Sequence, residues 1–385
     1  MGGLPSLDSG VLPDGVRARF VDSVNGLRMH ILEAGLEAGH ETPGRPLVLL
    51  LHGFPELAYS WRKIVPPLAA AGFHVVAPDQ RGYGRTTGWD PSYDGDLASS
   101  RMLNLTRDAL GLTAALGHSS AAAVIGHDFG ASVAAWCALT RPDRFRSLVL
   151  MSPFGGPPAL PETSAAPARS DEIHAALAAL PRPRKHYQWY YSTRPASADM
   201  TNCPQGVHAF LRGYVHMKSA DWPGNRPYRL AGWTAGELAT MPGYYIMDLH
   251  KTMPEQVAEE MPSPAEIAAC KWLTEDELAV YSGEYERTGF QGGLQWYRCR
   301  TEGVMLPELE LFAGRPIDVP LLFIGGKSDW GTFQTPGAFE RMQTRAVATD
   351  FRGAHLVDGA GHWVQQEQPE AVAALLLPFL NELRL

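Results

Sequence analysis

The five residues Gly126-His127-Asp128-Phe129-Gly130 decide the fold predicted for this chain. An apolar run, 121–125, precedes them, and a run of small residues, 131–135, follows. The pattern small-x-Asp-x-small between a buried strand and a helix is typical of a nucleophile elbow, a sharp turn that projects one side chain from the end of a sheet. Glycines are needed there because a Cβ atom would clash within the turn. The projected residue is Asp128, a candidate nucleophile. The alternative is a plain strand–turn–helix with a carboxylate near the helix N-terminus.

Strands and helices alternate on both sides of this turn. The sequence predicts a hairpin over 20–33, in which Asn25-Gly26 supplies the two positive-φ residues of the turn. Further strands are predicted at 46–51, 73–77, 121–127, 145–151, 319–325 and 355–357. Helices are predicted at 61–71, 101–116, 130–140 and 367–383. Such alternation predicts an α/β protein with a mostly parallel sheet flanked by helices.

Between residues 154 and 316 this alternation stops. Pro, Trp and Tyr are dense there, and helical pieces are predicted at 171–180, 186–192 and 274–288. A stretch of this length is not expected to be one structureless loop inside a compact domain. We therefore expect a core whose first part is 1–153, an inserted helical lid domain at 154–316, and the second part of the core at 317–385.

The composition argues against several classes of protein. A chain of 385 residues with a net charge of −8 and no basic run is unlike a nucleic-acid-binding surface. No apolar run is long enough to span a bilayer, and residues 1–17 lack the layout of a signal peptide. The four cysteines have no metal-type spacing and are expected to be free, mostly buried thiols. We expect a cytoplasmic protein with no metal and no cofactor; the oligomeric state is left open, a homodimer included.

Two more residues complete a candidate catalytic triad. In this fold class the members follow the order nucleophile, acid, base. Asp329 comes shortly after the strand 319–325, and His362 lies in a glycine-rich loop before the last helix. A histidine in such a loop needs a partner that holds its tautomer, and a loop carboxylate can do that. The other place for the acid, after the strand 145–151, offers no carboxylate.

An oxyanion hole needs two backbone N–H groups aimed at one point. The N–H of Phe129, directly after the nucleophile, is one candidate. The N–H of Phe54 is the other, since Gly53 lets the backbone approach and Pro55 fixes the bend, with a cis bond as an option. A plain exit from a strand is the alternative interpretation of this loop.

Five motifs now carry a resemblance to a known family. They are HGFPE at 52–56, DQRGYG at 79–84, GHDFG at 126–130, GGKSD at 325–329 and GAGHW at 359–363. From residue 46 to its end the chain resembles the α/β-hydrolase superfamily, and specifically the soluble epoxide hydrolases. The aspartate in the elbow is typical of the branch that holds epoxide hydrolases and dehalogenases. Phe129 departs from the Trp that many relatives carry, so the N–H is kept but an indole contact is not.

The resemblance also implies two lid tyrosines that hydrogen-bond the epoxide oxygen. The segment 289–298, GFQGGLQWYR, resembles the motif of the second, which is Tyr297. The segment 186–190, HYQWY, resembles the motif of the first, with Tyr187 as the match and Tyr190 close enough to be confused with it. Without the resemblance, these tyrosines would be interpreted as buried aromatic packing. The side chains expected to line the substrate pocket are Pro55, Gln188, Trp189, Tyr190 and Trp363.

Together these residues imply an epoxide hydrolase. Asp128 would attack an epoxide carbon while Tyr187 and Tyr297 donate to the oxygen. His362, oriented by Asp329, would then activate a water that hydrolyses the ester, and a vicinal diol would leave. The expected partners are a small-molecule epoxide and water. A haloalkane or haloacid dehalogenase with the same triad is the alternative, and a non-catalytic ligand-binding relative is another. The sequence leaves open which epoxide is used and whether the pathway is detoxification or secondary metabolism.

Overall fold

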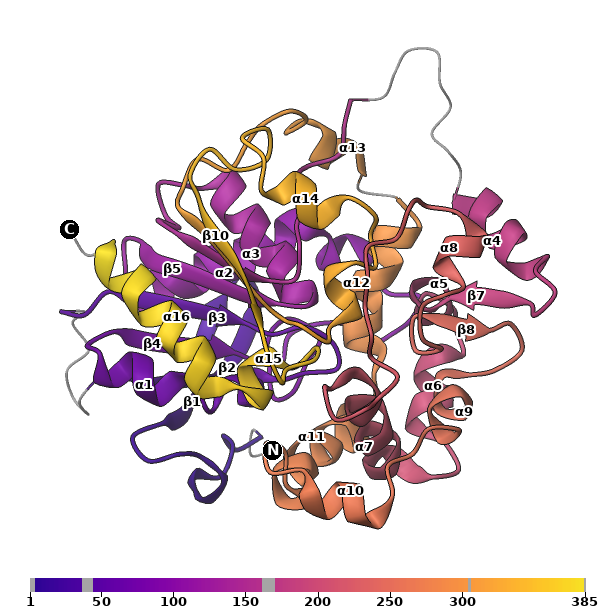
Figure 1. Cartoon of the computed structure of the whole chain (residues 1–385). Helices are drawn as coiled ribbons and strands as arrows, with labels where there is room; N and C mark the ends of the chain where they lie inside the picture. Colours follow the sequence, from indigo (N-terminus) through magenta and orange to yellow (C-terminus); the bar gives the residue numbers. More distant parts are fainter. Residues whose placement is uncertain (1–3, 37–43, 161–169, 304–305, 384–385) are drawn as a thin grey trace.

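A central mixed sheet organises the chain. The computed structural model describes residues 4–36, 44–160, 170–303 and 306–383, and within them the sheet has eight strands in the order β1-β2-β4-β3-β5-β6-β9-β10 (Figure 1). The strands are β1 (Arg17–Val24), β2 (Leu27–Ala34), β3 (Leu47–Leu51), β4 (His74–Pro78), β5 (Ala121–His127), β6 (Leu148–Met151), β9 (Leu321–Gly326) and β10 (Phe351–Val357). The pairs β1–β2 and β2–β4 are antiparallel, and the remaining pairs are parallel. This confirms the predicted α/β class with a mostly parallel sheet.

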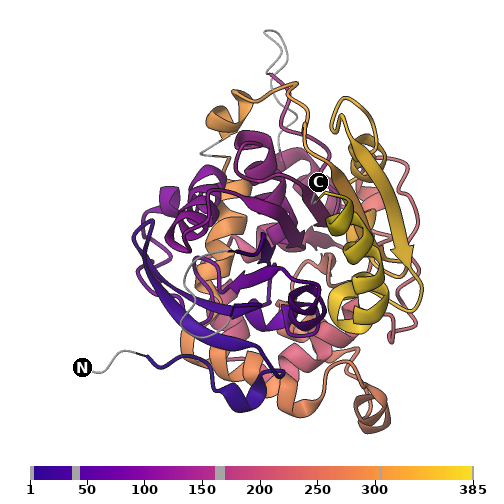
Figure 2. The ribbon, with the colours of Figure 1, turned by 90° about the vertical axis from the view of Figure 1, so that its left-hand side faces the viewer.

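Helices cover both faces of this sheet. Every residue of β3, β4, β6 and β9 is buried, as expected for parallel strands with a helix layer on each side. One pair of contacting helices is α1 (Val65–Ala70) and α16 (Pro369–Glu382). The other pair is α2 (Met102–Ala115) and α3 (Phe129–Thr140). Figure 2 shows the sheet between the two pairs.

Prolines shorten one of the predicted helices. In place of a helix over 61–71, the chain forms the 3-10 helix η2 (Ala58–Trp61) and the short α1. Pro66 and Pro67 lie in the first turn of α1, where a missing N–H is tolerated, whereas inside a longer helix they would break its hydrogen bonds. The predicted closing helix, 367–383, corresponds to α16, which begins at Pro369 after the short helix α15 (Val364–Glu367).

Among the described residues between β6 and β9, most of the secondary structure is helical, and these helices lie beside the sheet (Figure 1). The helices are α4 (Ser170–Ala178), α5 (Tyr187–Tyr191), α6 (Ala196–Thr201), α7 (Gly206–Lys218), α8 (Ala235–Leu238), α9 (Met253–Ala258), α10 (Pro264–Ala269), α11 (Glu275–Thr288), α12 (Gln291–Thr301) and α13 (Leu306–Glu310). A two-stranded antiparallel sheet of β7 (Arg184–His186) and β8 (Ile246–Asp248) was not predicted. Strands of three residues are too short to show the alternation by which a strand is recognised.

Short elements complete the described part of the chain. They are the 3-10 helices η1 (Ser9–Val11), η3 (Leu97–Ser100) and η4 (Trp330–Thr332) and the helix α14 (Ala338–Met342). Within the described ranges, no helix is long and apolar enough to cross a bilayer. All four cysteines are unpaired; Cys137 and Cys203 are buried, whereas Cys270 and Cys299 are only partly buried.

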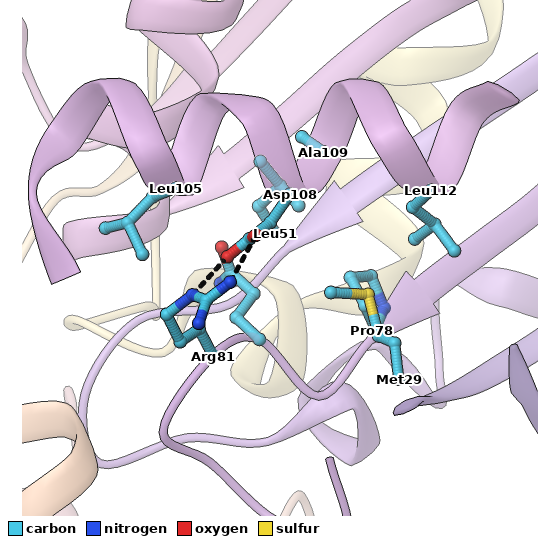
Figure 3. Close-up of a pocket in the computed structure, with 9 residues that line it drawn as sticks. Met29, Leu51, Pro78, Arg81, Leu105, Asp108, Ala109 and Leu112 are labelled. Atoms are coloured by element: carbon cyan, nitrogen blue, oxygen red, sulfur yellow. Dashed lines mark hydrogen bonds and ion pairs between the residues drawn. The ribbon is translucent and has the colours of Figure 1, made fainter. Parts of the chain in front are cut away.

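Buried polar contacts hold the loop 79–84 after β4. The guanidinium of Arg81 donates from Nε to Oδ2 of Asp108 at 2.7 Å and from Nη2 to Oδ1 at 2.8 Å. Figure 3 shows this ion pair between the loop and α2, beside a small cavity. Asp79 accepts a hydrogen bond of 2.9 Å from the N–H of Ala58 and lies 2.8 Å from Nδ1 of His30. A bidentate, buried arginine–carboxylate pair fixes position as well as charge, so this loop is a rigid support.

A close approach between glycines places α12 on that loop. A Cβ atom on Gly292 would lie 2.0 Å from the carbonyl oxygen of Gly82, a distance that no side chain tolerates. The indole Nε1 of Trp296 also donates to the carbonyl oxygen of Arg81 at 3.1 Å. The glycines near the start of α12 therefore fix how closely Tyr297, further along the same helix, approaches the sheet.

Candidate active site

Asp128 lies in a strained turn between β5 and α3. Its backbone has φ 50° and ψ −124°, a region that residues other than glycine rarely occupy. A Cβ atom on Gly126 would lie 2.3 Å from the carbonyl oxygen of Gly130. A Cβ atom on Gly130 would lie 2.3 Å from the carbonyl oxygen of Leu51 on the neighbouring strand. The two glycines thus allow the turn that raises the Asp128 carboxylate from the end of the sheet.

The structure brings His362 and Asp329 to this carboxylate. Nε2 of His362 lies 3.3 Å from Oδ2 of Asp128, and Nδ1 lies 3.1 Å from Oδ1 of Asp329. All three side chains are buried, and the Asp329 carboxylate also accepts a hydrogen bond of 2.6 Å from the N–H of Gly331. The imidazole is therefore held on one nitrogen and presents the other to Asp128, the arrangement that a general base requires.

The charges of the three groups stabilise one another. Burial alone would raise the pKa of the Asp128 carboxyl, but the contact with His362 and the charge of Lys218 hold this pKa well below its usual value. The pKa of Asp329 is lowered in the same way, because His362 outweighs the effect of burial. Burial and Lys218 act to lower the pKa of His362, but the two carboxylates outweigh them and raise it. Asp128 is consequently ionised at neutral pH and available as a nucleophile.

One backbone N–H points at the Asp128 carboxylate. The amide of Phe54 donates to Oδ1 at 3.0 Å. Gly53 permits this approach, because a Cβ atom there would lie 2.4 Å from the same Oδ1. The Phe54–Pro55 peptide bond is cis. The other expected donor, the N–H of Phe129, makes no hydrogen bond to this carboxylate within the described residues.

A cavity of about 770 Å³ opens above Asp128. Both the sheet side and the helical segment contribute to its wall, among them Asp128, Phe129, Tyr187, Gln188, Trp296 and Tyr297. Three arginines, Arg101, Arg300 and Arg341, also line it, and Asp128 is the one acidic residue among its described lining residues. This volume is in the range of small-molecule sites.

Tyr187 and Tyr297 lie next to each other in the wall of this cavity, with their rings edge to face. Their ring centroids are 6.0 Å apart, and both side chains are buried. The Tyr187 hydroxyl donates to Oε1 of Gln334 at 3.2 Å and accepts a bond of 3.0 Å from Nε2 of Gln188. Burial and the charge of Asp128 raise the pKa of both phenols, so both are protonated donors at neutral pH.

Side-chain direction separates Tyr187 from Tyr190. The Tyr190 hydroxyl points to α6, where it donates to Oδ2 of Asp199 at 2.9 Å, and Tyr190 is not part of the cavity lining. The two residues are three positions apart on α5, yet only Tyr187 turns toward Asp128.

Five side chains were predicted to line the substrate pocket, but only Gln188 lines this cavity. The structure places the other four elsewhere. Tyr190 is turned away as described, and Trp189 packs against His186 at 5.3 Å between ring centroids. Pro55 and Trp363 line a separate, much smaller cavity. The indole Nε1 of Trp363 donates to the carbonyl oxygen of Val215 at 2.9 Å, which directs the ring toward α7.

Comparison with known proteins agrees with this fold. A family model described as alpha/beta hydrolase fold matches residues 46–236. Epoxide hydrolase A of Mycobacterium tuberculosis is 35% identical over 95% of this chain and 98% of its own length. The chain belongs to the epoxide hydrolase family of α/β hydrolases. It is therefore an enzyme of the hydrolase class.

Two further comparisons cover almost the whole chain. A solved structure, an epoxide hydrolase from an endophytic Streptomyces, has a TM-score of 0.73 and 32% identity, covering 97% of each chain. A Bacillus subtilis protein named only for the hydrolase superfamily is 40% identical over 96% of this chain and 99% of its own length.

In this epoxide hydrolase family member, a buried network that the sequence analysis did not assign contacts the backbone of His362. Nδ1 of His127 lies 2.5 Å from Oε2 of Glu56, and Nε2 of the same ring lies 2.6 Å from the carbonyl oxygen of His362. Glu56 also accepts a bond of 2.9 Å from the N–H of Gly53. Glu56 lies in the HGFPE motif and His127 in the GHDFG motif, so their positions in the motifs could have marked them as functional residues. Their contact could not be predicted, because it depends on the pairing of β3 with β5.

The buried carboxyl of Glu367 also holds the His362 loop by hydrogen bonds. Glu367 accepts backbone N–H bonds from Ala220 at 2.8 Å, Gly361 at 2.9 Å and Trp363 at 2.9 Å. Burial raises its pKa to about 8, despite these three donors. Among the described residues, no group of three or more His, Cys, Asp or Glu side chains is arranged to hold a metal ion.

Proposed function

We propose that this protein opens an epoxide to a vicinal diol through a covalent ester on Asp128. The observation that supports this most directly is the cavity in which an ionised carboxylate faces two protonated phenols, with a histidine behind the carboxylate. Such a site combines a nucleophile, two proton donors and a base, which are the groups that a two-step epoxide opening needs.

In the first step, Oδ2 of Asp128 attacks an epoxide carbon. Oδ1 accepts the hydrogen bond from Phe54, so Oδ2 is the oxygen left to form the new C–O bond. The carbon–oxygen bond of the ring breaks, and the departing alkoxide takes a proton from Tyr187 or Tyr297. An alkoxide is a poor leaving group, and this proton transfer is what makes the opening feasible.

In the second step, His362 takes a proton from a water, and the resulting hydroxide attacks Cγ of Asp128. The developing oxyanion on Oδ1 is stabilised by the N–H of Phe54, and the N–H of Phe129 is proposed as a second donor. The intermediate expels the alkoxide, which takes the proton back from His362. Asp128 leaves this step as a carboxylic acid and returns its proton to the phenolate, which restores the starting state.

Single turnover in water labelled with oxygen-18 tests this path. We expect the label to enter the Asp128 carboxylate first and to reach the diol only in later turnovers, because water attacks Cγ and not the substrate. Label that appears in the diol in the first turnover would contradict the ester. The control is Asp128→Asn, which is expected to form no diol in the same assay.

The alternative activity, removal of halide from a haloalkane or haloacid, uses the same triad. The two buried phenols favour an epoxide, because a leaving halide needs only weak N–H contacts and no proton. A panel of epoxides and haloalkanes distinguishes the activities, with diol formation and halide release measured on the same enzyme. Halide release at a kcat/KM above that of every epoxide tested would overturn the proposal.

We also propose that residues 154–316 act as a lid, because they carry Tyr187 and Tyr297 to the cavity above Asp128. Excluding water from such a site would protect the ester until a single water is admitted. The cytoplasmic location, the homodimer and the role in detoxification or secondary metabolism stay predictions.

A further inference from the structure

A buried lysine stands beside the triad without a carboxylate in contact. Lys218 is the last residue of α7 and only 2% exposed. Its ammonium makes no ion pair or hydrogen bond with any residue that the structure describes. Instead, four aromatic rings surround Nζ, with centroids at 5.0 Å (Tyr245), 5.3 Å (Tyr214), 5.5 Å (Trp363) and 5.8 Å (Tyr244).

Burying an ammonium group costs free energy, and cation–π contacts offset only part of that cost. Burial accordingly lowers the pKa of Lys218, while the charges of Asp128, Asp329 and Glu56 oppose the shift. These three carboxylates come from three different loops at the ends of β5, β9 and β3, and each is close enough for its charge to act on the lysine. A lysine retained at such a cost, beside the reacting groups, is a candidate for a functional role.

The end of α7 is also hydrogen-bonded to the His362 loop. The carbonyl oxygen of Lys218 accepts a bond of 2.8 Å from the N–H of His362. A Cβ atom on Gly361 would lie 2.6 Å from the same oxygen, so the two backbones touch. These contacts involve only the backbone of Lys218. The side chain can therefore be changed without removing the contact that positions His362.

We propose that Lys218 is a positioning residue for ester hydrolysis, in which its charge keeps the His362 imidazole unprotonated so that it can accept a proton from water. The inference rests on the proposed function. Two carboxylates favour the imidazolium before reaction, and Lys218 opposes them. Once Asp128 becomes a neutral ester, Asp329 alone favours the imidazolium, and Lys218 balances its charge.

The effects on His362 support this order of events. Lys218 is the strongest charged group acting to lower the pKa of His362, and Asp329 and Asp128 act to raise it. Because ester formation removes the charge of Asp128, the pKa of His362 is expected to fall when the base is needed. Without Lys218, the imidazole would keep its proton to higher pH and hydrolysis would slow.

The test is Lys218→Met, which has a side chain of similar length and no charge, in a stopped-flow experiment that separates ester formation from ester hydrolysis between pH 5 and 9. We expect the acid limb of hydrolysis to move up by about one pH unit, which slows hydrolysis by about tenfold on that limb, while ester formation changes less. Wild-type hydrolysis rates should be recovered at high pH. An equal loss of rate at every pH, or an acid limb that does not move, would overturn the role of the charge.

Two further variants complete the experiment. Lys185→Met is the matched control, since the ammonium of Lys185 also lies over a tyrosine ring, 4.9 Å from the centroid of Tyr190, but not beside the triad; its pH profile should match the wild type. Lys218→Gln is a second neutral variant and should reproduce the shift seen with Met. Because the change removes a buried charge, we expect the Tm of Lys218→Met to be no lower than that of the wild type.

The outcomes separate the two proposals. If the wild type forms no ester with any epoxide, the proposed function fails, and the role of Lys218 fails with it. If an ester forms and hydrolyses but both neutral variants keep the wild-type acid limb, only the role of Lys218 is wrong.

Discussion

The N–H of Phe54 donates to Oδ1 of Asp128 at 3.0 Å. This contact distinguishes the two oxygens of one carboxylate, since the other, Oδ2, faces Nε2 of His362 at 3.3 Å. In the proposed mechanism, Oδ1 becomes the carbonyl oxygen of the ester and then the oxyanion. Oδ2 would then attack the substrate without any rotation of the side chain.

Gly53→Ala should reduce activity strongly. The new Cβ atom would lie 2.3 Å from Cβ and 2.4 Å from Oδ1 of Asp128, so either the Phe54 N–H or the carboxylate must move. Loss of one oxyanion donor typically lowers kcat by 10²–10³-fold. Steady-state kinetics would measure this. The control is Gly283→Ala on α11, where a Cβ atom meets nothing within 4 Å. This variant should keep the wild-type kcat. If Gly53→Ala lowered kcat no more than Gly283→Ala does, the prediction would be contradicted.

Tyr187→Phe and Tyr297→Phe should each slow ester formation, by about 10–10²-fold, because each removes one proton donor and leaves the other. The double variant should lose nearly all ester formation. Rapid-mixing kinetics under single-turnover conditions measure this step directly. Tyr190→Phe is the matched control from the same helix, since its hydroxyl is bound to Asp199, and its rate should stay within about twofold of wild type. A larger loss in Tyr190→Phe than in Tyr187→Phe would reverse the assignment.

His362→Gln should trap the ester. The amide cannot take a proton from water, so the second step stops while Oδ2 of Asp128 can still attack. After mixing with an epoxide, mass spectrometry of the intact protein should show an added mass equal to that of the substrate. After digestion, the added mass should be found on the peptide that contains Asp128. The same variant combined with Asp128→Asn should show no addition, and modification elsewhere would argue against this nucleophile.

Glu33→Gln should destabilise the fold at neutral pH. Glu33 is buried on β2, where it accepts bonds from Arg17 at 2.8 Å and Arg19 at 2.5 Å and lies 3.2 Å from Nε2 of His74. Burial acts to raise its pKa, but His74 and the arginines outweigh it and lower the pKa from 4.5 to about 2. A folded-state pKa below the unfolded value contributes stability above pH 4.5 that is lost as the pH falls toward 2.

The shift corresponds to about 3 kcal/mol in the free energy of unfolding at pH 7. Urea unfolding should show a difference of this order between wild type and Glu33→Gln at pH 7, and less than half of it at pH 3. Glu286→Gln, at an exposed position on α11, is the control and should change little at either pH. A difference that stays constant with pH would show that the loss comes from packing and not from the charge.

The local pattern of the sequence was enough to predict the strands of the main sheet and the elbow. Glycines on both sides of Asp128 are needed wherever such a turn occurs, and apolar runs of five or six residues are typical of strands buried on both faces. These signals depend on neighbours in the chain. For the same reason, the break at Pro66 and Pro67 was available in the sequence but was missed when the longer helix was predicted.

Only the tertiary structure decided which side chains meet above Asp128. It turned Tyr187 into the cavity and Tyr190 toward Asp199, and it placed Trp363 against α7 instead of the substrate space. It also surrounded Lys218 with four rings from three separate segments. A side chain's direction depends on how segments far apart in the chain pack, and no spacing within one motif contains that information.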